Sequence, residues 1–206
     1  MSYERKNEPL EGKMKRRGYL LVIASLVIFL IQGAAFGQFG IRKGVKFGYN
    51  FATLSGDQTT NVQTRKAITG GIGFEFGFLG LLSAQTDVLY SPKGVVLASN
   101  NETCLNYLSL QFVLKKKFFP VGIHPYLLAG PEFSYLLSAK SAGNSIKDKI
   151  KSQDLAAVVG GGLEFSFLGK SIYIEGRYCY GLDNISKEEE TSSKNRVSQI
   201  FVGLLL

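Results

Sequence analysis

The sequence has few of the residues that hydrolytic and metal sites need. Its 206 residues include one histidine, His124, and two cysteines, Cys104 and Cys179. A zinc site built from Cys and His needs about four ligands, so these numbers exclude it. A nucleophile activated by histidine needs the imidazole beside it, and His124 lies next to Pro125 in a predicted short turn. The sequence therefore predicts no catalytic residue, no metal site and no cofactor.

Long apolar runs are also missing beyond the N-terminus. No segment after residue 37 reaches the run of about 18 apolar residues that marks a spanning helix. The glycine-rich segments Gly70–Gly73 and Gly160–Gly162 lack the Lys-Ser/Thr ending of a phosphate-binding loop, so we interpret them as strand glycines. Tryptophan is absent, so an aromatic girdle at a membrane surface would rest on Tyr and Phe, such as Tyr49, Tyr90, Tyr135, Tyr178 and Tyr180.

The N-terminus has the pattern of an export signal. Lys15, Arg16 and Arg17 precede an apolar run from Tyr19 to Ile31, which is followed by the small-x-small sequence Ala35-Phe36-Gly37. This order is typical of a secretory signal peptide. A transmembrane anchor is the alternative, but the run is shorter than the roughly 20 residues that a spanning helix needs. We predict cleavage after Gly37, with residues 1–37 removed and 38–206 forming one domain.

The chain is basic, with a formal net charge of +8. Removing residues 1–37 takes away six bases and three acids, which leaves 18 bases and 13 acids, a net charge of +5. A basic chain can bind nucleic acid or anionic surfaces. The export signal argues against nucleic acid, and we expect solvated loops that face an anionic cell surface, because several bases lie in predicted loops: Lys140, Lys147, Lys149 and Lys151.

Apolar and polar residues alternate with a period of two in eight stretches. These cover residues 44–51, 71–78, 84–91, 108–115, 126–137, 155–167, 172–180 and 199–206, and the last is the weakest. Successive side chains of a strand point to opposite faces. Each stretch therefore has one face of large apolar residues, such as Val45, Phe47, Tyr49 and Phe51 in the first, and one face of small or polar residues. The pattern predicts eight strands.

Short and long connections separate these stretches in turn. Short ones are predicted near Phe78–Leu82, Lys117–His124 and Phe167–Ser171. Long polar ones are predicted at Ser55–Lys66, Ser91–Thr103, Ser138–Gln153 and Asp183–Arg196. Short turns at one end and longer loops at the other are typical of an up-and-down barrel in a bacterial outer membrane.

Two kinds of barrel fit the alternation, and they differ in which face looks inward. A soluble lipocalin-like barrel would bury the large apolar residues, whereas a membrane barrel turns them toward lipid. The Phe and Tyr side chains are too bulky for a narrow soluble core, and glycines cluster opposite them, as a cramped interior of eight strands requires. With the export signal, this favours an all-β fold: an eight-stranded antiparallel up-and-down transmembrane β-barrel. Since hydrocarbon offers a free edge no partner, Val197–Leu206 should pair with Lys43–Leu54.

The polar faces carry charged residues that we expect to form an ion-pair network inside the barrel. These are Lys46, Glu75, Asp87, Lys115, Glu132, Glu164, Glu175 and Arg177. A catalytic role would need substrate access, and a barrel of eight strands has no open channel. Calcium binding by Asp183 and Glu188–Glu190 is conceivable, but an acidic solvated loop explains them more simply.

Several segments resemble the PorT-type outer-membrane β-barrel family of the Bacteroidota. They are Gly44–Phe51 with Leu54–Asp57, Asp87–Gly94, Tyr107–Leu110, Pro125–Pro131 and Tyr173–Tyr178 with Gly181-Leu182. The resemblance implies an eight-stranded outer-membrane barrel, and the family's namesake takes part in type IX secretion. One departure concerns the end of the chain, Gly203–Leu206, where outer-membrane barrels commonly carry an aromatic residue; Phe201 is the nearest.

These observations predict a structural or interaction protein rather than an enzyme. The expected role is that of an integral outer-membrane barrel with a filled interior, which contacts partners through its external loops. The alternatives are an accessory component of a secretion or transport machinery and a small channel. The expected partners are outer-membrane lipid, the barrel-assembly machinery and secretion-system subunits, and not nucleic acid.

Overall fold

The structure, a computed structural model, describes residues 40–56, 62–79, 81–97, 102–119, 122–187 and 193–206. The predicted signal peptide and its cleavage site at Gly37 lie outside these residues, as do Glu188–Glu190 of the conceivable calcium site. Almost all of the described chain is β-strand. The strands are β1 (Ile41–Gly56), β2 (Val62–Leu79), β3 (Leu82–Leu97), β4 (Glu102–Lys117), β5 (Ile123–Ser141), β6 (Asn144–Ser145), β7 (Gln153–Phe167), β8 (Lys170–Gly181) and β9 (Ser193–Leu205), with one short 3-10 helix, η1 (Lys147–Lys149).

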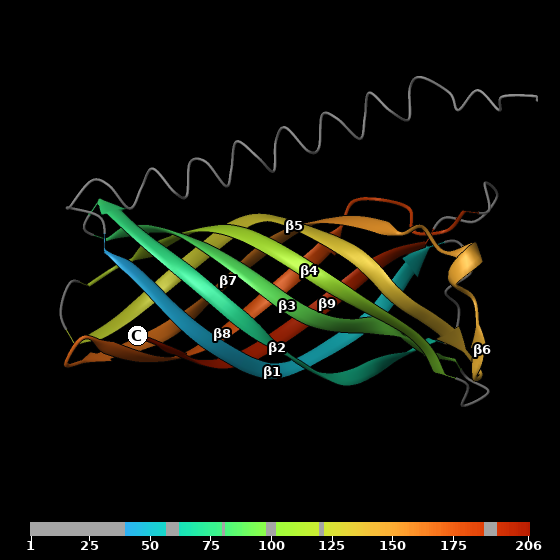
Figure 1. Cartoon of the computed structure of the whole chain (residues 1–206), viewed down its shortest axis with the longest axis horizontal. Helices are drawn as coiled ribbons and strands as arrows, with labels where there is room; N and C mark the ends of the chain where they lie inside the picture. Colours follow the sequence, from blue (N-terminus) through green and yellow to red (C-terminus); the bar gives the residue numbers. More distant parts are fainter. Residues whose placement is uncertain (1–39, 57–61, 80, 98–101, 120–121, 188–192) are drawn as a thin grey trace, which may run out of the picture. The chain divides into compact units, whose positions relative to one another are not determined.

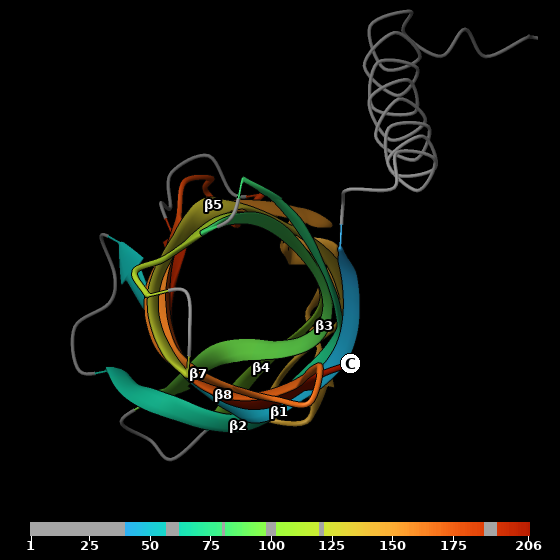
Figure 2. The ribbon, with the colours of Figure 1, turned by 90° about the vertical axis from the view of Figure 1, so that its left-hand side faces the viewer.

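Eight of these strands form a closed antiparallel barrel, as the sequence predicts (Figures 1 and 2). Each pairs with the neighbours that precede and follow it along the chain, with β7 next to β5. The ring closes through β9 and β1, where Val202 pairs with Phe47 and Leu204 with Val45. Strand β6 is not part of the wall, because it pairs only with the end of β5. Among the described residues, every strand of the barrel wall therefore has a hydrogen-bonded neighbour on both sides.

Tight turns join the strands at one end of the barrel, which we call the turn end. Between β7 and β8, Leu168 and Gly169 both have positive φ, 49° and 77°. Two successive residues in this conformation match the twist of a two-residue hairpin. The first residue of β1 and the last of β9 belong to the same end, since Lys43 and Leu206 exchange backbone hydrogen bonds of 3.0 and 2.7 Å. The other end, where β1, β3, β5 and β8 finish, is the loop end.

The predicted long connections at the loop end were too long. The stretch Ser91–Thr103 was predicted as a loop, but β3 continues to Leu97 and β4 begins at Glu102. Likewise β1 reaches Gly56, β2 begins at Val62, and β9 begins at Ser193 inside the predicted loop Asp183–Arg196. The prediction was wrong because it assigned the polar ends of these strands to loops. Paired strands satisfy each other's backbone groups whatever their side chains, so the wall extends beyond the apolar band.

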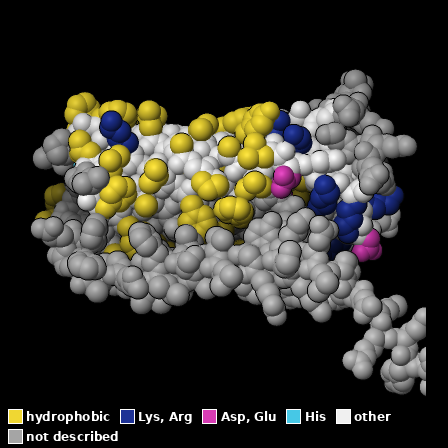
Figure 3. All heavy atoms as spheres, turned by 90° about the horizontal axis from the view of Figure 1, so that it is seen from above, with side chains coloured by type: hydrophobic (Ala, Val, Ile, Leu, Met, Phe, Trp, Pro, Cys, Tyr) yellow, Lys and Arg dark blue, Asp and Glu magenta, His cyan; other side chains and the backbone are white. Residues whose placement is uncertain are grey.

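The two faces of the wall differ as the alternation predicts. Outward side chains are apolar and exposed, with Phe47 at 66%, Phe165 at 45% and Phe74 at 39%, whereas the inward side chains of Lys46 and Arg177 are at 2% and 3%. Hydrophobic side chains spread over the barrel wall, and Lys and Arg gather near the loop end (Figure 3). This arrangement contradicts the soluble lipocalin-like alternative, which would bury the phenylalanines. No helix among the described residues is long and apolar enough to cross a membrane.

Candidate functional site: the charged barrel interior

All eight residues of the predicted ion-pair network lie inside the barrel. They come from seven strands, which converge because alternate residues of every strand point inward. Each is at most 3% exposed: Lys46 on β1, Glu75 on β2, Asp87 on β3, Lys115 on β4, Glu132 on β5, Glu164 on β7, and Glu175 and Arg177 on β8. Their ion pairs form three clusters along the barrel.

The central cluster joins two bases and two acids from β1, β3 and β8. The guanidinium of Arg177 lies 2.8 Å from Oδ2 of Asp87 and 2.7 Å from Oε1 of Glu175. The ammonium of Lys46 lies 2.9 and 3.2 Å from the same two oxygens. Tyr126 donates a hydrogen bond of 2.9 Å to the other oxygen of Glu175. Each charged group in the cluster therefore contacts at least two groups of opposite charge.

The cluster at the turn end joins three bases to two acids. Arg42 contacts Glu75 at 2.6 Å and Glu164 at 2.7 Å. Lys115 lies 3.0 Å from Glu75 and 2.8 Å from Glu164. Lys117 contacts the same carboxylates at 3.3 and 2.9 Å. One more base than acid thus takes part in this cluster.

The cluster nearer the loop end is built around Lys93. Its ammonium lies 2.7 Å from Glu132 and 3.2 Å from Asp154, and Asn195 donates a hydrogen bond of 2.8 Å to Asp154. Gln111 joins this cluster to the central one, because its amide donates to Glu132 and its oxygen accepts from Arg177. The polar contacts therefore run continuously through these two clusters.

The network contains four charged residues that sequence reasoning missed: Arg42, Lys93, Lys117 and Asp154. Lys93 and Lys117 were assigned to connections, and Arg42 and Asp154 lay just outside the predicted strands. The period of two would have identified them, because residues an even number of positions apart on a strand point to the same face. Lys93 lies an even number of residues from the inward Asp87, and Lys117 lies an even number from the inward Lys115. Extending each predicted strand by a few residues, with the same alternation of inward and outward side chains, would have placed all four inside the barrel.

The charges of the three clusters balance within the described residues. Six bases (Arg42, Lys46, Lys93, Lys115, Lys117 and Arg177) face six acids (Glu75, Asp87, Glu132, Asp154, Glu164 and Glu175) in these ion pairs. Burying a charge is tolerable only when it is paired and its remaining hydrogen-bonding groups are satisfied. The equal numbers explain how so many ionic groups can occupy a narrow interior.

Large aromatic side chains fill the space between the ion pairs. The ammonium of Lys115 lies 3.9 Å from the ring centroid of Tyr126, and that of Lys46 lies 5.4 Å from the ring centroid of Tyr173. Glycines make room for both rings, since a Cβ at Gly162 would meet Oη of Tyr126 at 2.7 Å and one at Gly203 would overlap the ring of Tyr173. Crowding by these rings therefore explains the inward glycines Gly162 and Gly203.

An apolar cluster, which we call the cap, covers the interior at the loop end. It consists of Leu105, Tyr107, Leu136, Ala139 and Ile185, with Leu54, Ile146 and Ile150 packed against it. Ile185, Ile146 and Ile150 lie in two different connections. These connections are tied together by an isolated bridge between Ile150 and Ser186 and by a 2.8 Å hydrogen bond from the amide of Lys151 to the carbonyl of Ile185.

The remaining candidate residues do not come together. His124 is buried at the turn end, where Nδ1 lies 2.6 Å from the carbonyl oxygen of Phe119. Both cysteines are free; Cys104 is half-buried on β4, and Cys179 is buried on β8. Within the part of the chain that the structure describes, no three His, Cys, Asp or Glu side chains are arranged to hold a metal ion. All four lysines predicted in loops are exposed: Lys147, Lys149 and Lys151 lie in the connection between β5 and β7, whereas Lys140 belongs to β5, because backbone pairing carries that strand further than predicted.

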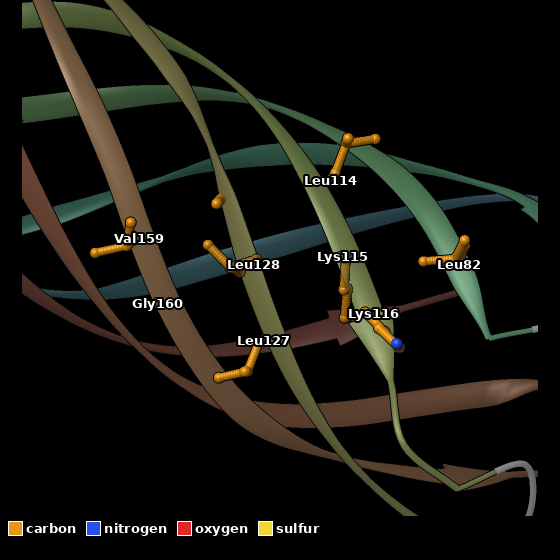
Figure 4. A pocket seen from close by; sticks show the side chains of 9 residues that line it. Leu82, Leu114, Lys115, Lys116, Leu127, Leu128, Val159 and Gly160 are labelled. Atoms are coloured by element: carbon orange, nitrogen blue, oxygen red, sulfur yellow. The ribbon is translucent and has the colours of Figure 1, made fainter.

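A shallow hollow of about 380 Å³ lies on the outer wall across β3, β4, β5 and β7 (Figure 4). Its side chains are mainly aliphatic, among them Leu82, Leu114, Leu127 and Val159. Lys116 is the charged side chain on the outward face of this hollow. Because it opens on the lipid-facing wall, the hollow fits contact with membrane lipid.

Comparison with known proteins agrees with this architecture. The crystal structure of Neisserial surface protein A (NspA) is similar, with a TM-score of 0.57 and 15% identity over 81% of this chain and 98% of that chain. The crystal structure of the outer membrane protein OprG from Pseudomonas aeruginosa gives a TM-score of 0.52 and 13% identity over 82% of this chain and 95% of that one. At such identities the likeness shows the fold alone. No curated protein matches the chain.

A family model matches most of the sequence. The model of the outer membrane protein beta-barrel domain aligns with residues 36–187, which include β1 to β8. A family of outer-membrane barrels implies location in the outer membrane. The closed ring of eight strands, its apolar outer wall and its charged interior agree with that location. This chain belongs to the outer membrane protein beta-barrel domain family.

Proposed function

We propose that this protein is an integral outer-membrane barrel whose interior is filled by side chains and whose external loops carry its interactions. The supporting observation is the central cluster, where Arg177 and Lys46 contact Asp87 and Glu175 across the barrel with almost no exposure. An ion crossing the barrel would have to break these contacts. The exposed loops remain as the surface for a role outside the membrane.

The proposal includes an export route and a set of partners. The chain would be exported by its N-terminal signal, cleaved after Gly37 and inserted by the barrel-assembly machinery. It would contact outer-membrane lipid through its apolar wall and anionic surfaces through the loop lysines, and it would not bind nucleic acid. An enzymatic role or a cofactor is not part of the proposal, since a catalytic group in the interior would need substrate access through the ion pairs.

Conductance across planar bilayers tests the filled interior. We expect the purified protein to insert without stable conductance steps, measured beside a porin under the same salt and voltage. The control for insertion is protection of the barrel from added protease. Stable steps from inserted protein would contradict the proposal and favour the small channel.

The resemblance to the PorT-type family supports a second role, as an accessory component of a secretion machinery. Segments such as Gly44–Phe51 and Tyr173–Tyr178 carry that resemblance. Mild detergent extraction followed by affinity purification distinguishes the two roles. Stoichiometric co-purification of secretion subunits would support the second role, and recovery of the barrel without them would support the first.

A further inference from the structure

A small pocket opens into the interior at the turn end of the barrel, apart from the cap and the loops. Its volume is about 200 Å³, and its lining includes Arg42, Glu75, Gly77, Ser83 and Lys117. These residues come from the beginning of β1 and β3 and from the end of β2 and β4. The pocket therefore lies at the end of the barrel that faces the periplasm in an outer-membrane protein with short periplasmic turns.

The pocket exists because β2 has a glycine at an inward position. Gly77 pairs with Ser83 on β3, and among the described residues a Cβ built at Gly77 would meet only the carbonyl oxygen of Gly40, at 3.9 Å. Elsewhere along the inward faces, glycines are overlapped by neighbouring groups, as at Gly203 beside Tyr173. Gly77 thus leaves open space inside the barrel wall at this position.

Among the described residues, the hydroxyl of Ser83 has no hydrogen-bond partner. Its residue is 4% exposed, and Oγ is buried. A buried hydroxyl without a partner is unfavourable, and most buried polar groups of this kind have one. Ser83 faces inward beside Lys115, its register partner on β4, and it lines the pocket. It can donate one hydrogen bond to a molecule held there.

The charge around the pocket is positive by one unit. Three bases of the turn-end cluster, Arg42, Lys115 and Lys117, share the carboxylates of Glu75 and Glu164. The ammonium of Lys117 has three N–H donors for these two carboxylates. The side chain of His124 is buried at the same end and adds no negative charge. An anion with several acceptor oxygens would match both the extra charge and the free donors.

We propose that the turn-end pocket binds a phosphate group between the ammonium of Lys117 and the hydroxyl of Ser83. A phosphate offers several acceptor oxygens, which suits a hydroxyl and a charged donor from the neighbouring strands β3 and β4. The phosphate can come from free inorganic phosphate or from a phospholipid headgroup, and both sources have the same chemistry. This site lies at the other end of the barrel from the external loops, and it shares Lys117 with the turn-end cluster.

Titration of the folded protein with inorganic phosphate, in a detergent without phosphate groups, tests the site. We expect saturable shifts of the backbone amide signals of Gly77 and Ser83 in solution NMR, measured against chloride at equal ionic strength. Gly77→Leu fills the pocket without changing any charge and should abolish the shifts. Lys117→Gln should raise the dissociation constant about tenfold, because a hydrogen bond to a charged group is lost.

Lys116→Gln is the matched control, because Lys116 is adjacent in sequence but exposed on the outer wall. It should leave phosphate binding unchanged. Ser83→Ala, a small change that preserves the fold, should weaken binding several-fold. Unfolding of a variant is detected by loss of the band shift between unheated and boiled samples. Absence of saturation in the wild type, or equal weakening by Lys116→Gln and Lys117→Gln, would overturn the proposal.

A second titration, with short-chain phosphatidylglycerol, identifies the source of the phosphate. Shifts of Gly77 and Ser83 with both ligands would assign the site to a phosphate group in general, including a headgroup. Shifts with inorganic phosphate alone would assign it to the free anion. Shifts with neither would contradict the site itself.

Discussion

At the scale of single residues, the cost of an unpaired charge governs the barrel interior. Arg177 contacts two carboxylates and the oxygen of Gln111, so it links the central cluster to the one nearer the loop end. Glu132 is linked in turn to Lys93 and Gln111. Removing one member leaves its partners buried without enough opposite charge, which costs more than the net contribution of the pair itself.

Arg177→Ala should therefore lower the free energy of unfolding by about 3–5 kcal/mol, the usual cost of breaking a buried ion pair. The loss is expected because Asp87 and Glu175 would share Lys46 alone. Urea unfolding in lipid vesicles, followed by tyrosine fluorescence, measures it. Lys116→Ala, which removes an exposed base from the outer wall, should change stability by less than about 1 kcal/mol. Equal stability of the two variants would refute the structural role of the network.

At the scale of strands, the alternation of inward and outward side chains and the length of a strand have different physical causes. The alternation arises because one face of the wall contacts lipid and the other contacts packed ion pairs. It is therefore visible in the sequence, as in the outward apolar residues Val45, Phe47 and Tyr49. Strand length follows from backbone pairing, which continues after the outward residues become polar. On β1 the outward side chains change to Thr53 and Ser55 while pairing with β9 continues to Gly56. Sequence polarity therefore locates the lipid boundary and not the end of the strand.

A charge on the outer wall should destabilise the barrel according to its depth. Phe47 lies near the middle of the outward apolar stretch of β1, so Phe47→Lys should cost about 2–4 kcal/mol. Phe76 is three residues from the end of β2, and Phe76→Lys should cost about 0–1 kcal/mol. Ser145→Lys, on exposed β6, should cost almost nothing. Equilibrium unfolding in vesicles ranks the three, and equal tolerance of all three would contradict the assignment of faces.

At the scale of the whole molecule, closure of the ring decides whether the fold exists. Strand β9 pairs with β8 on one side and β1 on the other, so it is the element that removes the last free edges. In hydrocarbon, each backbone group left without a partner costs several kcal/mol. A local element such as β6 has no comparable role, because it pairs only with two residues of β5.

Removal of β9 should abolish folding into detergent micelles or vesicles. The intact barrel is expected to migrate differently on a denaturing gel before and after boiling, since a closed sheet resists detergent, and the chain that ends before Ser193 should show no such difference. Replacing residues 144–149 by Gly and Ser should preserve the difference, because the barrel wall stays intact. A band shift in the truncated chain would contradict closure through β9.

The sequence by itself determined the number of strands in the barrel, the direction of each face and eight of the twelve charges in the interior ion pairs. It could do so because lipid and a narrow interior impose a period of two on every strand, which is a local signal. Only the tertiary structure decided which charges meet, since Lys93, Glu132 and Asp154 come from three strands. The cap and the pocket beside Gly77 also depend on segments that are far apart in the sequence and that closure of the barrel brings together. No local sequence pattern shows that these segments meet.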